Sequence, residues 1–89
     1  MSEKKAPLLT FPCDFAIKVM GRQAEDFPQQ VLDLLRQHFA ESDILDTRQR
    51  ESRGAAYLAL TVTVRARSRA QLDAAYQALN DAEYVLMTL

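Results

Sequence analysis

Cysteine, histidine and glycine are scarce in this chain of 89 residues. The one cysteine, Cys13, can form no internal disulfide, which excludes the cross-linked framework of a small secreted domain. One cysteine and one histidine, His38, cannot make a closed zinc site, so we expect neither a metal nor a cofactor. The two glycines, Gly21 and Gly54, stand far apart and form no glycine-rich loop for a phosphate group.

A basic excess and long apolar runs are also missing. The net charge is −1 and the sequence pI is about 5.7, so bulk attraction to nucleic acid or to an anionic membrane is not expected. The longest apolar stretch, residues 55–64, is interrupted by Thr61 and Thr63 and is too short to span a bilayer. No apolar run of signal-peptide length follows the N-terminus, and we expect a cytoplasmic protein.

Catalytic groups are few. Cys13 lies beside Asp14, whose negative charge opposes thiolate formation, so we interpret the cysteine as a small residue at the edge of the core. His38 ends the apolar stripe of a predicted helix, and we interpret it as a packed residue favoured by the helix dipole. We therefore predict that the chain is not an enzyme.

Hydrophobic periodicity predicts two helices and four strands. Residues 1–10, polar at first and containing Pro7, are predicted to be a flexible tail, and residues 11–89 a single domain. The predicted elements are a strand at 14–20, a helix at 26–39, strands at 44–52 and 55–66, a helix at 68–80 and a strand at 84–89.

Caps and turns mark the ends of these elements. Gly21 is predicted to end the first strand. Asp26 is predicted to cap the first helix with its side chain, Pro28 fits the first turn of that helix, and Ser68 is predicted to cap the second helix. A two-residue turn at Arg53-Gly54 would direct Arg48 and Arg50 outward and Leu45, Thr47 and Gln49 inward. The predicted pairs are Leu45 with Val62 and Arg48 with Ala59.

The β-α-β-β-α-β order predicts an α+β fold. Right-handed crossovers place the first and third strands side by side in the centre of a four-stranded antiparallel sheet. Both helices then cover one face of that sheet. This arrangement is the ferredoxin-like sandwich, which leaves the other sheet face open.

Particular residues suggest a family. They are Phe11-Pro12, Phe15 and Lys18-Val19-Met20-Gly21, then Ser52, Gly54 and Tyr57 around the hairpin, Ser68, Gln71, Leu72, Asp73, Tyr76 and Leu79 in the second helix, and the ending Val85, Met87, Leu89. Over residues 11–89 the chain resembles the YbeD-like family of small bacterial proteins. The resemblance implies a ferredoxin-like fold, similar in shape to regulatory domains that bind amino acids, and supplies no biochemical role.

The open sheet face carries the candidate site. Its binding residues are predicted to be Lys18, Arg48, Arg50, Tyr57 and Arg65. One interpretation is that charged side chains keep exposed strands soluble and discourage edge pairing. The other is a surface for an acidic partner protein or a small anionic metabolite. Arg65, Arg67 and Arg69 form a second basic cluster, of which Arg67 and Arg69 lie near the start of the second helix. We interpret this cluster as solvated rather than anion-binding.

The leading hypothesis is a non-enzymatic binding or regulatory domain that uses this open face. The alternative is a weak single-stranded nucleic-acid binder, because residues 53–60 resemble the third-strand motif of RNA-recognition domains. Tyr57 is the only aromatic residue in that segment, which disfavours the alternative. A third hypothesis is an enzyme that acts as part of a complex, for which the sequence offers only His38 and Cys13 as candidate titratable groups. A homodimer through an edge strand or the open face is compatible with all three hypotheses.

Overall fold

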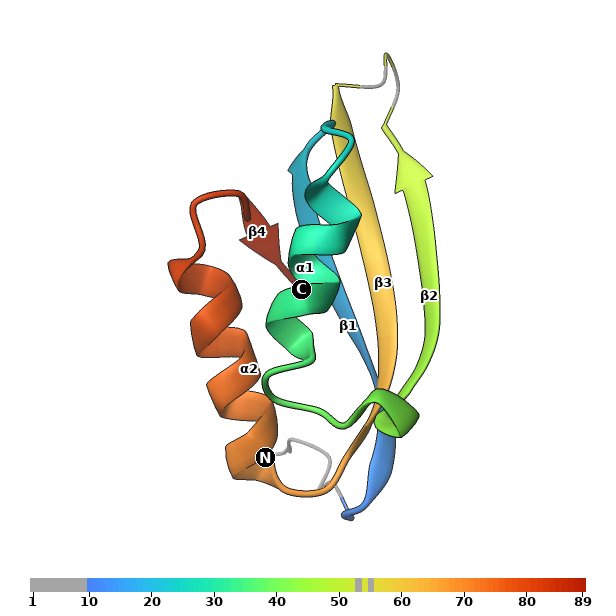
Figure 1. The fold of residues 1–89 in the computed structure, drawn as a ribbon, viewed down its shortest axis with the longest axis vertical. Coiled ribbons are helices and arrows are strands. Elements are labelled where there is room, and N and C mark those ends of the chain that lie inside the picture. The colour runs from blue at the N-terminus through green and yellow to red at the C-terminus, as the bar shows by residue number, and fades with distance from the viewer. Residues whose placement is uncertain (1–9, 53, 55) are drawn as a thin grey trace, which may run out of the picture.

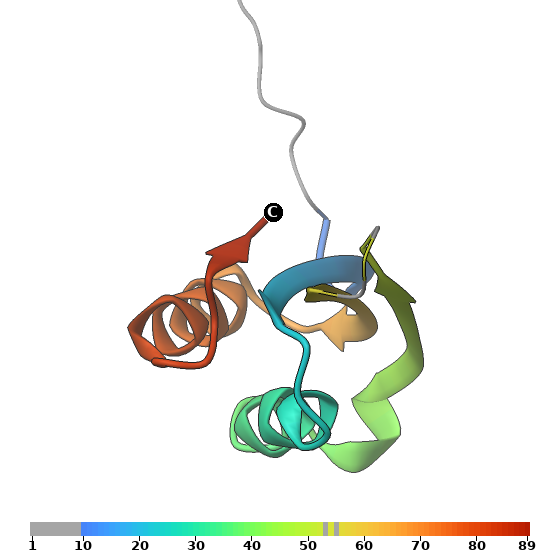
Figure 2. The ribbon, with the colours of Figure 1, turned by 90° about the horizontal axis from the view of Figure 1, so that it is seen from above.

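The structure is a computed structural model that describes residues 10–52, 54 and 56–89. Its elements are β1 (Cys13–Arg22), α1 (Phe27–Leu35), the 3₁₀ turn η1 (Glu41–Asp43), β2 (Ile44–Glu51), β3 (Tyr57–Ala66), α2 (Arg69–Asp81) and β4 (Met87–Thr88). In this part of the chain four strands form one antiparallel sheet in the order β2-β3-β1-β4, with both helices on one face (Figures 1 and 2). The predicted α+β, ferredoxin-like architecture is confirmed. Apart from Thr10, the predicted tail at 1–10 lies outside the described residues.

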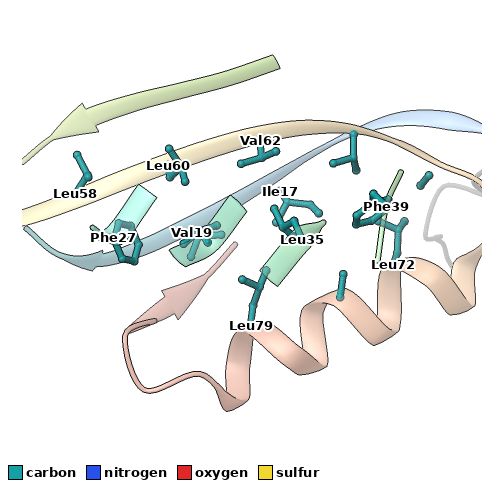
Figure 3. Close-up of a cluster of buried hydrophobic side chains, with 14 residues drawn as sticks. Ile17, Val19, Phe27, Leu35, Phe39, Leu58, Leu60, Val62, Leu72 and Leu79 are labelled. Carbon is teal, nitrogen blue, oxygen red and sulfur yellow. The ribbon is translucent and has the colours of Figure 1, made fainter. Parts of the chain in front are cut away.

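The central strands β1 and β3 pair over their whole length, from Cys13 with Ala66 to Arg22 with Tyr57. Alternate residues of both strands point toward the helices and form the core between the two layers (Figure 3). The fully buried core residues include Ile17 on β1, Leu60, Val62 and Val64 on β3, Val31 and Leu35 on α1, and Ala75 and Leu79 on α2. In the described part of the chain, neither helix is long and apolar enough to cross a membrane.

Gly21 does not end the first strand, as the sequence predicted, because β1 continues through it to Arg22. The glycine is needed for close packing. A Cβ atom at this position would collide with the ring of Phe27 and would lie 2.7 Å from the carbonyl oxygen of Tyr84. The rings of Phe27 and Tyr84 meet edge to face, with centroids 6.4 Å apart. Gly21 therefore allows the start of α1 and the segment before β4 to close onto the sheet.

The first helix is shorter than the predicted 26–39, because α1 ends at Leu35. The N–H groups of Gln37 and His38 donate to carbonyls three residues back, at 3.1 and 2.9 Å, which tightens the chain into a turn. The predicted side-chain cap is also wrong. Asp26 occupies the N-cap position, but its side chain makes no capping hydrogen bond, whereas Pro28 lies in the first turn as expected.

The predicted hairpin register is wrong by two residues. The observed pairs are Thr47 with Val62, Arg48 with Thr61 and Arg50 with Ala59. The shift arises because the loop is longer than a two-residue turn: the Ser52 N–H donates to the Tyr57 carbonyl at 2.9 Å. A shift of two residues preserves the direction of each side chain, so Arg48 and Arg50 still face outward.

Leu45 lies at a bulge in β2 and is 41% exposed instead of facing the core. Gly54 has a φ of 81°, the positive value expected of a turn glycine. Arg53, the other residue of the predicted turn, lies outside the described residues.

The N-terminus of α2 is capped as predicted, since the Gln71 N–H donates to the Ser68 hydroxyl oxygen at 3.1 Å. The Gln71 side chain also accepts a hydrogen bond from the Arg67 N–H and donates one to the His38 carbonyl at 2.7 Å. His38 thus lies half-buried beyond the end of α1, with its backbone tied to α2.

The final strand is shorter than the predicted 84–89. Only Met87–Thr88 pairs with β1. Before it, Tyr84 packs against the core and its hydroxyl donates to the Gln30 carbonyl at 3.2 Å.

Among the described residues, Asp43 is the one carboxylate that is buried, with 3% of its surface exposed. Arg67 donates two hydrogen bonds to it, at 2.8 and 2.9 Å. These bonds hold the pKa of Asp43 below its usual value of 3.8, and the positive charges of Arg67 and Arg65 act in the same direction against the effect of burial. Arg67 is 61% exposed, in agreement with its interpretation as a solvated side chain, and it also neutralises Asp43 and joins η1 to the end of β3.

Gly21→Ala is expected to lower the free energy of unfolding by about 1–3 kcal/mol, because the added methyl group has no space between Phe27 and Tyr84. Urea denaturation measures the loss. Phe27→Leu should lower the free energy of unfolding by less in the Gly21→Ala variant than in the wild type, because the smaller side chain relieves the collision. Gly54→Ala is the matched control: a Cβ there meets no atom within 4 Å and should show no coupling to Phe27. Additive effects of Gly21→Ala and Phe27→Leu would contradict this account.

Asp43→Asn is expected to destabilise the protein most at neutral pH. A carboxylate whose folded pKa is depressed contributes stability above its unfolded pKa, and this contribution disappears as the pH falls through the folded value. The difference in unfolding free energy between wild type and Asp43→Asn should therefore shrink as the pH falls below about 4. Urea denaturation at pH 7, 5, 4 and 3 measures it. Asp14→Asn, which removes the exposed pair with Arg65, should change stability by less than about 1 kcal/mol throughout. A pH-independent difference for Asp43→Asn would refute the assignment.

Candidate binding surface on the open sheet face

Two rows of outward side chains cross the middle of the open sheet face. In the first row Met20 pairs with Met87 on one side and with Ala59 on the other, and Ala59 in turn pairs with Arg50. The second row is formed by Lys18, Thr61 and Arg48. Each row therefore places a small residue of β3 next to an arginine of β2.

The small residues leave a hollow on this face. It has a volume of about 510 Å³, with Lys18, Arg48 and Arg50 around Ala59 and Thr61. A second hollow of about 180 Å³ adjoins it toward Tyr57 and Met20. A third, of about 60 Å³, lies between Lys18, Met20 and Leu89. Three of the five predicted binding residues thus surround one depression, and Tyr57 borders its neighbour.

The remaining predicted residue, Arg65, is not part of this group. It pairs with Asp14 across β1 and β3 and donates to its carboxylate at 3.4 Å, at the opposite end of the strands from Tyr57. Arg48 contacts Asp46 on its own strand at 3.0 Å, but 83% of its side chain is exposed. Within the part of the chain that the structure describes, Lys18 and Arg50 form no ion pair. Tyr57, 39% exposed, lies at the start of β3 and not in the centre of the face.

The charge of the molecule differs between its two sides. The outward positions of the sheet carry five cationic side chains and two carboxylates: Lys18, Arg22, Arg48, Arg50 and Arg65 against Asp14 and Asp46. The other described residues carry three arginines and nine carboxylates. The outward positions of the sheet are therefore net positive in a protein with a net charge of −1, although Glu51 at the end of β2 lines the second hollow beside Arg50.

The site also has an apolar margin that the sequence interpretation missed. Met87 and Leu89 are 50% and 69% exposed, and Met87 pairs directly with Met20. The Leu89 N–H donates to the Lys18 carbonyl at 2.9 Å, which extends this margin beside the second row. The signal was present in the alternation of Met87 and Leu89, but the direction of that alternation depends on how β4 pairs with β1.

A separate hollow of about 220 Å³ lies off this face, between the start of α1 and the segment before β4. Phe27, Tyr84 and Leu86 supply apolar walls, and Arg22 and Glu83 are its charged residues. Burial raises the pKa of Tyr84, and the negative charge of Asp33 adds to the effect. Cys13 is half-buried at the start of β1. Within residues 10–52, 54 and 56–89, no three side chains of His, Cys, Asp or Glu gather where they could hold a metal ion.

The fold and sequence together define a class of small bacterial α+β proteins. Solved structures of the same fold include protein HP0495 from H. pylori, with a TM-score of 0.77 and 17% identity over 96% of this chain and 89% of that one. Another is the uncharacterised protein TM1266 from Thermotoga maritima, with a TM-score of 0.63 and 17% identity over 85% of this chain and 92% of that one. At this level of identity the likeness shows the fold alone.

The sequence relatives identify the family. UPF0250 protein NE1487 of Nitrosomonas europaea is 45% identical over 82 residues, which cover 92% of this chain and 94% of the relative. A UPF0250 protein of Paraburkholderia phytofirmans is 43% identical over the whole of both chains. Residues 6–89 match the family described as protein of unknown function DUF493. The chain belongs to this DUF493/UPF0250 family, which confirms the YbeD-like resemblance.

Proposed function

We propose that this protein is a non-enzymatic binding and regulatory module that holds an anionic partner against its open sheet face. The observation that supports this most strongly is the convergence of Lys18, Arg48 and Arg50 on one hollow of about 510 Å³. Two of these cations, Lys18 and Arg50, have no carboxylate partner among the described residues. An incoming carboxylate or phosphate would accept hydrogen bonds from these two side chains and balance their positive charge.

The cationic cluster of Lys18, Arg48 and Arg50 could instead serve to keep the sheet edge from pairing with other chains, but this role accounts for only some of its members. Arg48 and Arg50 lie on the outer strand β2, where positive side chains discourage pairing with other chains. Lys18 lies on β1, and at this residue both sides of the strand are occupied: it pairs with Thr61 of β3, and its carbonyl accepts a hydrogen bond from the Leu89 N–H. Its position beside two arginines of another strand therefore supports a binding role for the group.

Nucleic acid is the less favoured anionic partner. Single strands bind to sheet faces largely by stacking their bases on aromatic side chains. Among the described residues that point outward from the sheet, Tyr57 is the only aromatic one, and it lies at one end of β3. The rest of the face offers small, aliphatic and charged side chains, which suit a protein or a small metabolite better.

The double change Arg48→Glu with Arg50→Glu is expected to abolish partner binding and leave the fold intact, because both side chains point into solvent. Native mass spectrometry of the protein purified gently from its own host measures the bound mass. Urea denaturation checks stability, which should change by less than about 1 kcal/mol. The matched control is Arg36→Glu with Arg69→Glu, two exposed arginines on the helical side, which should retain the partner.

A bound mass that survives in the Arg48→Glu, Arg50→Glu variant would place the binding site elsewhere and overturn the proposal. The hollow between Arg22, Tyr84 and Glu83 would then be the next surface to alter.

A further inference from the structure

The open face is divided lengthwise into two margins of different chemistry. Arg48 and Arg50 form the cationic margin on β2, whereas Met20, Met87 and Leu89 form the apolar margin on β1 and β4, where Lys18 is a cationic neighbour of Met20 and Leu89. Small residues of β3 form the floor between them, at Ala59 and Thr61. An inorganic anion would engage the cationic margin alone. A ligand that uses the whole face must carry negative charge along one side and apolar groups along the other.

The width of the face suits an α-helix. Three strand spacings of about 4.8 Å separate β4 from β2, which puts the two margins about 14 Å apart. A helix with its side chains is about 10–12 Å wide, and one of about 16 residues would follow the strands for about 24 Å. The ten-residue strands β1 and β3 are long enough to support it along that length.

An extended peptide is a poorer fit to the same surface. A strand gains its hydrogen bonds at the edge of a sheet, whereas the centre of the face offers side chains and no free backbone groups. A strand lying on the face would bury its own N–H and C=O groups without partners, which is costly. A helix pairs its backbone groups internally and presents only side chains.

We propose that the occupant of the open face is an amphipathic α-helix of a partner protein, with an acidic stripe beside an apolar one. The apolar stripe packs on Met20, Met87 and Leu89, and the acidic stripe faces Arg48 and Arg50. This inference rests on the proposed anion-binding function and specifies the partner. A second copy of the chain in a symmetric face-to-face arrangement is disfavoured, because it would oppose two faces that each carry five cations and two carboxylates.

The paired methionines are consistent with a helix-binding surface. Met20 and Met87 are unbranched and flexible, and they lie directly opposite each other across β1 and β4. Such side chains adapt their shape to differently spaced apolar groups. The apolar margin therefore supplies contact area, while the cations set the orientation of the helix.

The test uses four synthetic probes against the full-length protein. The first is a helical peptide of about 16 residues with a leucine stripe flanked by a glutamate stripe. The second has the same composition in an order that breaks the stripes. The third is polyglutamate, and the fourth is a single-stranded oligonucleotide. Fluorescence anisotropy measures affinity, and amide shifts of the labelled protein report which strands are contacted.

The striped peptide is expected to bind at least about tenfold more tightly than the scrambled peptide, with shifts on all four strands, β4 included. Arg48→Glu with Arg50→Glu should weaken it by about tenfold or more. Met87→Ser should also weaken it severalfold, whereas Leu86→Ser should not. These neighbours are 50% and 48% exposed, but Leu86 lines the separate hollow off the face, so they form a matched pair.

Two results would overturn the helix assignment and leave the proposed function standing. The first is equal binding of both peptides and polyglutamate, lost on charge reversal, because the face would then recognise charge without an apolar stripe. The second is tighter binding of the oligonucleotide than of the striped peptide. Absence of binding by every probe would also overturn the helix assignment, and the bound mass from the host would then decide the proposed function independently.

Discussion

The antiparallel pairing of β1 with β3 is the constraint on which the rest of the structure depends. Their ten consecutive pairs lock two long strands in one register, so that alternate side chains have only two directions available. Ile17 and Val62 consequently lie in the core, while their sequence neighbours Lys18 and Thr61 lie on the open face. A slip of one residue would expose the core and bury a lysine. The stability of the domain and the composition of its candidate site therefore follow from the same register.

This dependence explains what the sequence could predict. Two-residue alternation in strands and helical spacing in helices are local properties, and they led to the correct element order and sheet topology. Some ends of elements have local signals, such as the Ser68 cap of α2, and were predicted correctly. Other ends depend on contacts between distant residues, and there the predictions failed. Gly21 was interpreted as a strand breaker because its isolated preference is for turns, although its actual role is to make room for Phe27 and Tyr84. The first helix stops at Leu35, after which a tightened turn brings Phe39 into the core, and no local signal marks that position.

The candidate site, like the fold, was predictable where local alternation decides the direction of a side chain and not where distant contacts decide it. The outward direction of Arg48 and Arg50 withstood an error of two residues in the hairpin register, since side-chain direction repeats every two residues. The apolar margin was not predictable, because the direction of Met87 and Leu89 depends on the pairing of β4 with β1. Arg67 shows the opposite case. It stands in a run of alternating arginines, yet a buried carboxylate 24 residues away, Asp43, determines its role.

Engagement by a carboxylate thus distinguishes Arg67 and Arg36 from Lys18 and Arg50 of the candidate site. Arg67 is engaged by Asp43, and Arg36 by Asp33 and Glu41, so their charges are satisfied within the fold. On the sheet face the two carboxylates lie toward one end, where Asp14 pairs with Arg65 and Asp46 contacts Arg48. The hollow between Lys18 and Arg50 contains no carboxylate among its lining residues. The fold thus pairs Arg36, Arg67 and Arg69 with carboxylates on the helical side, but among the described residues it leaves Lys18 and Arg50 without one. This difference supports the proposed recognition of negative charge on the open face, and the adjacent Met20 and Met87 support the proposed contact with an apolar stripe.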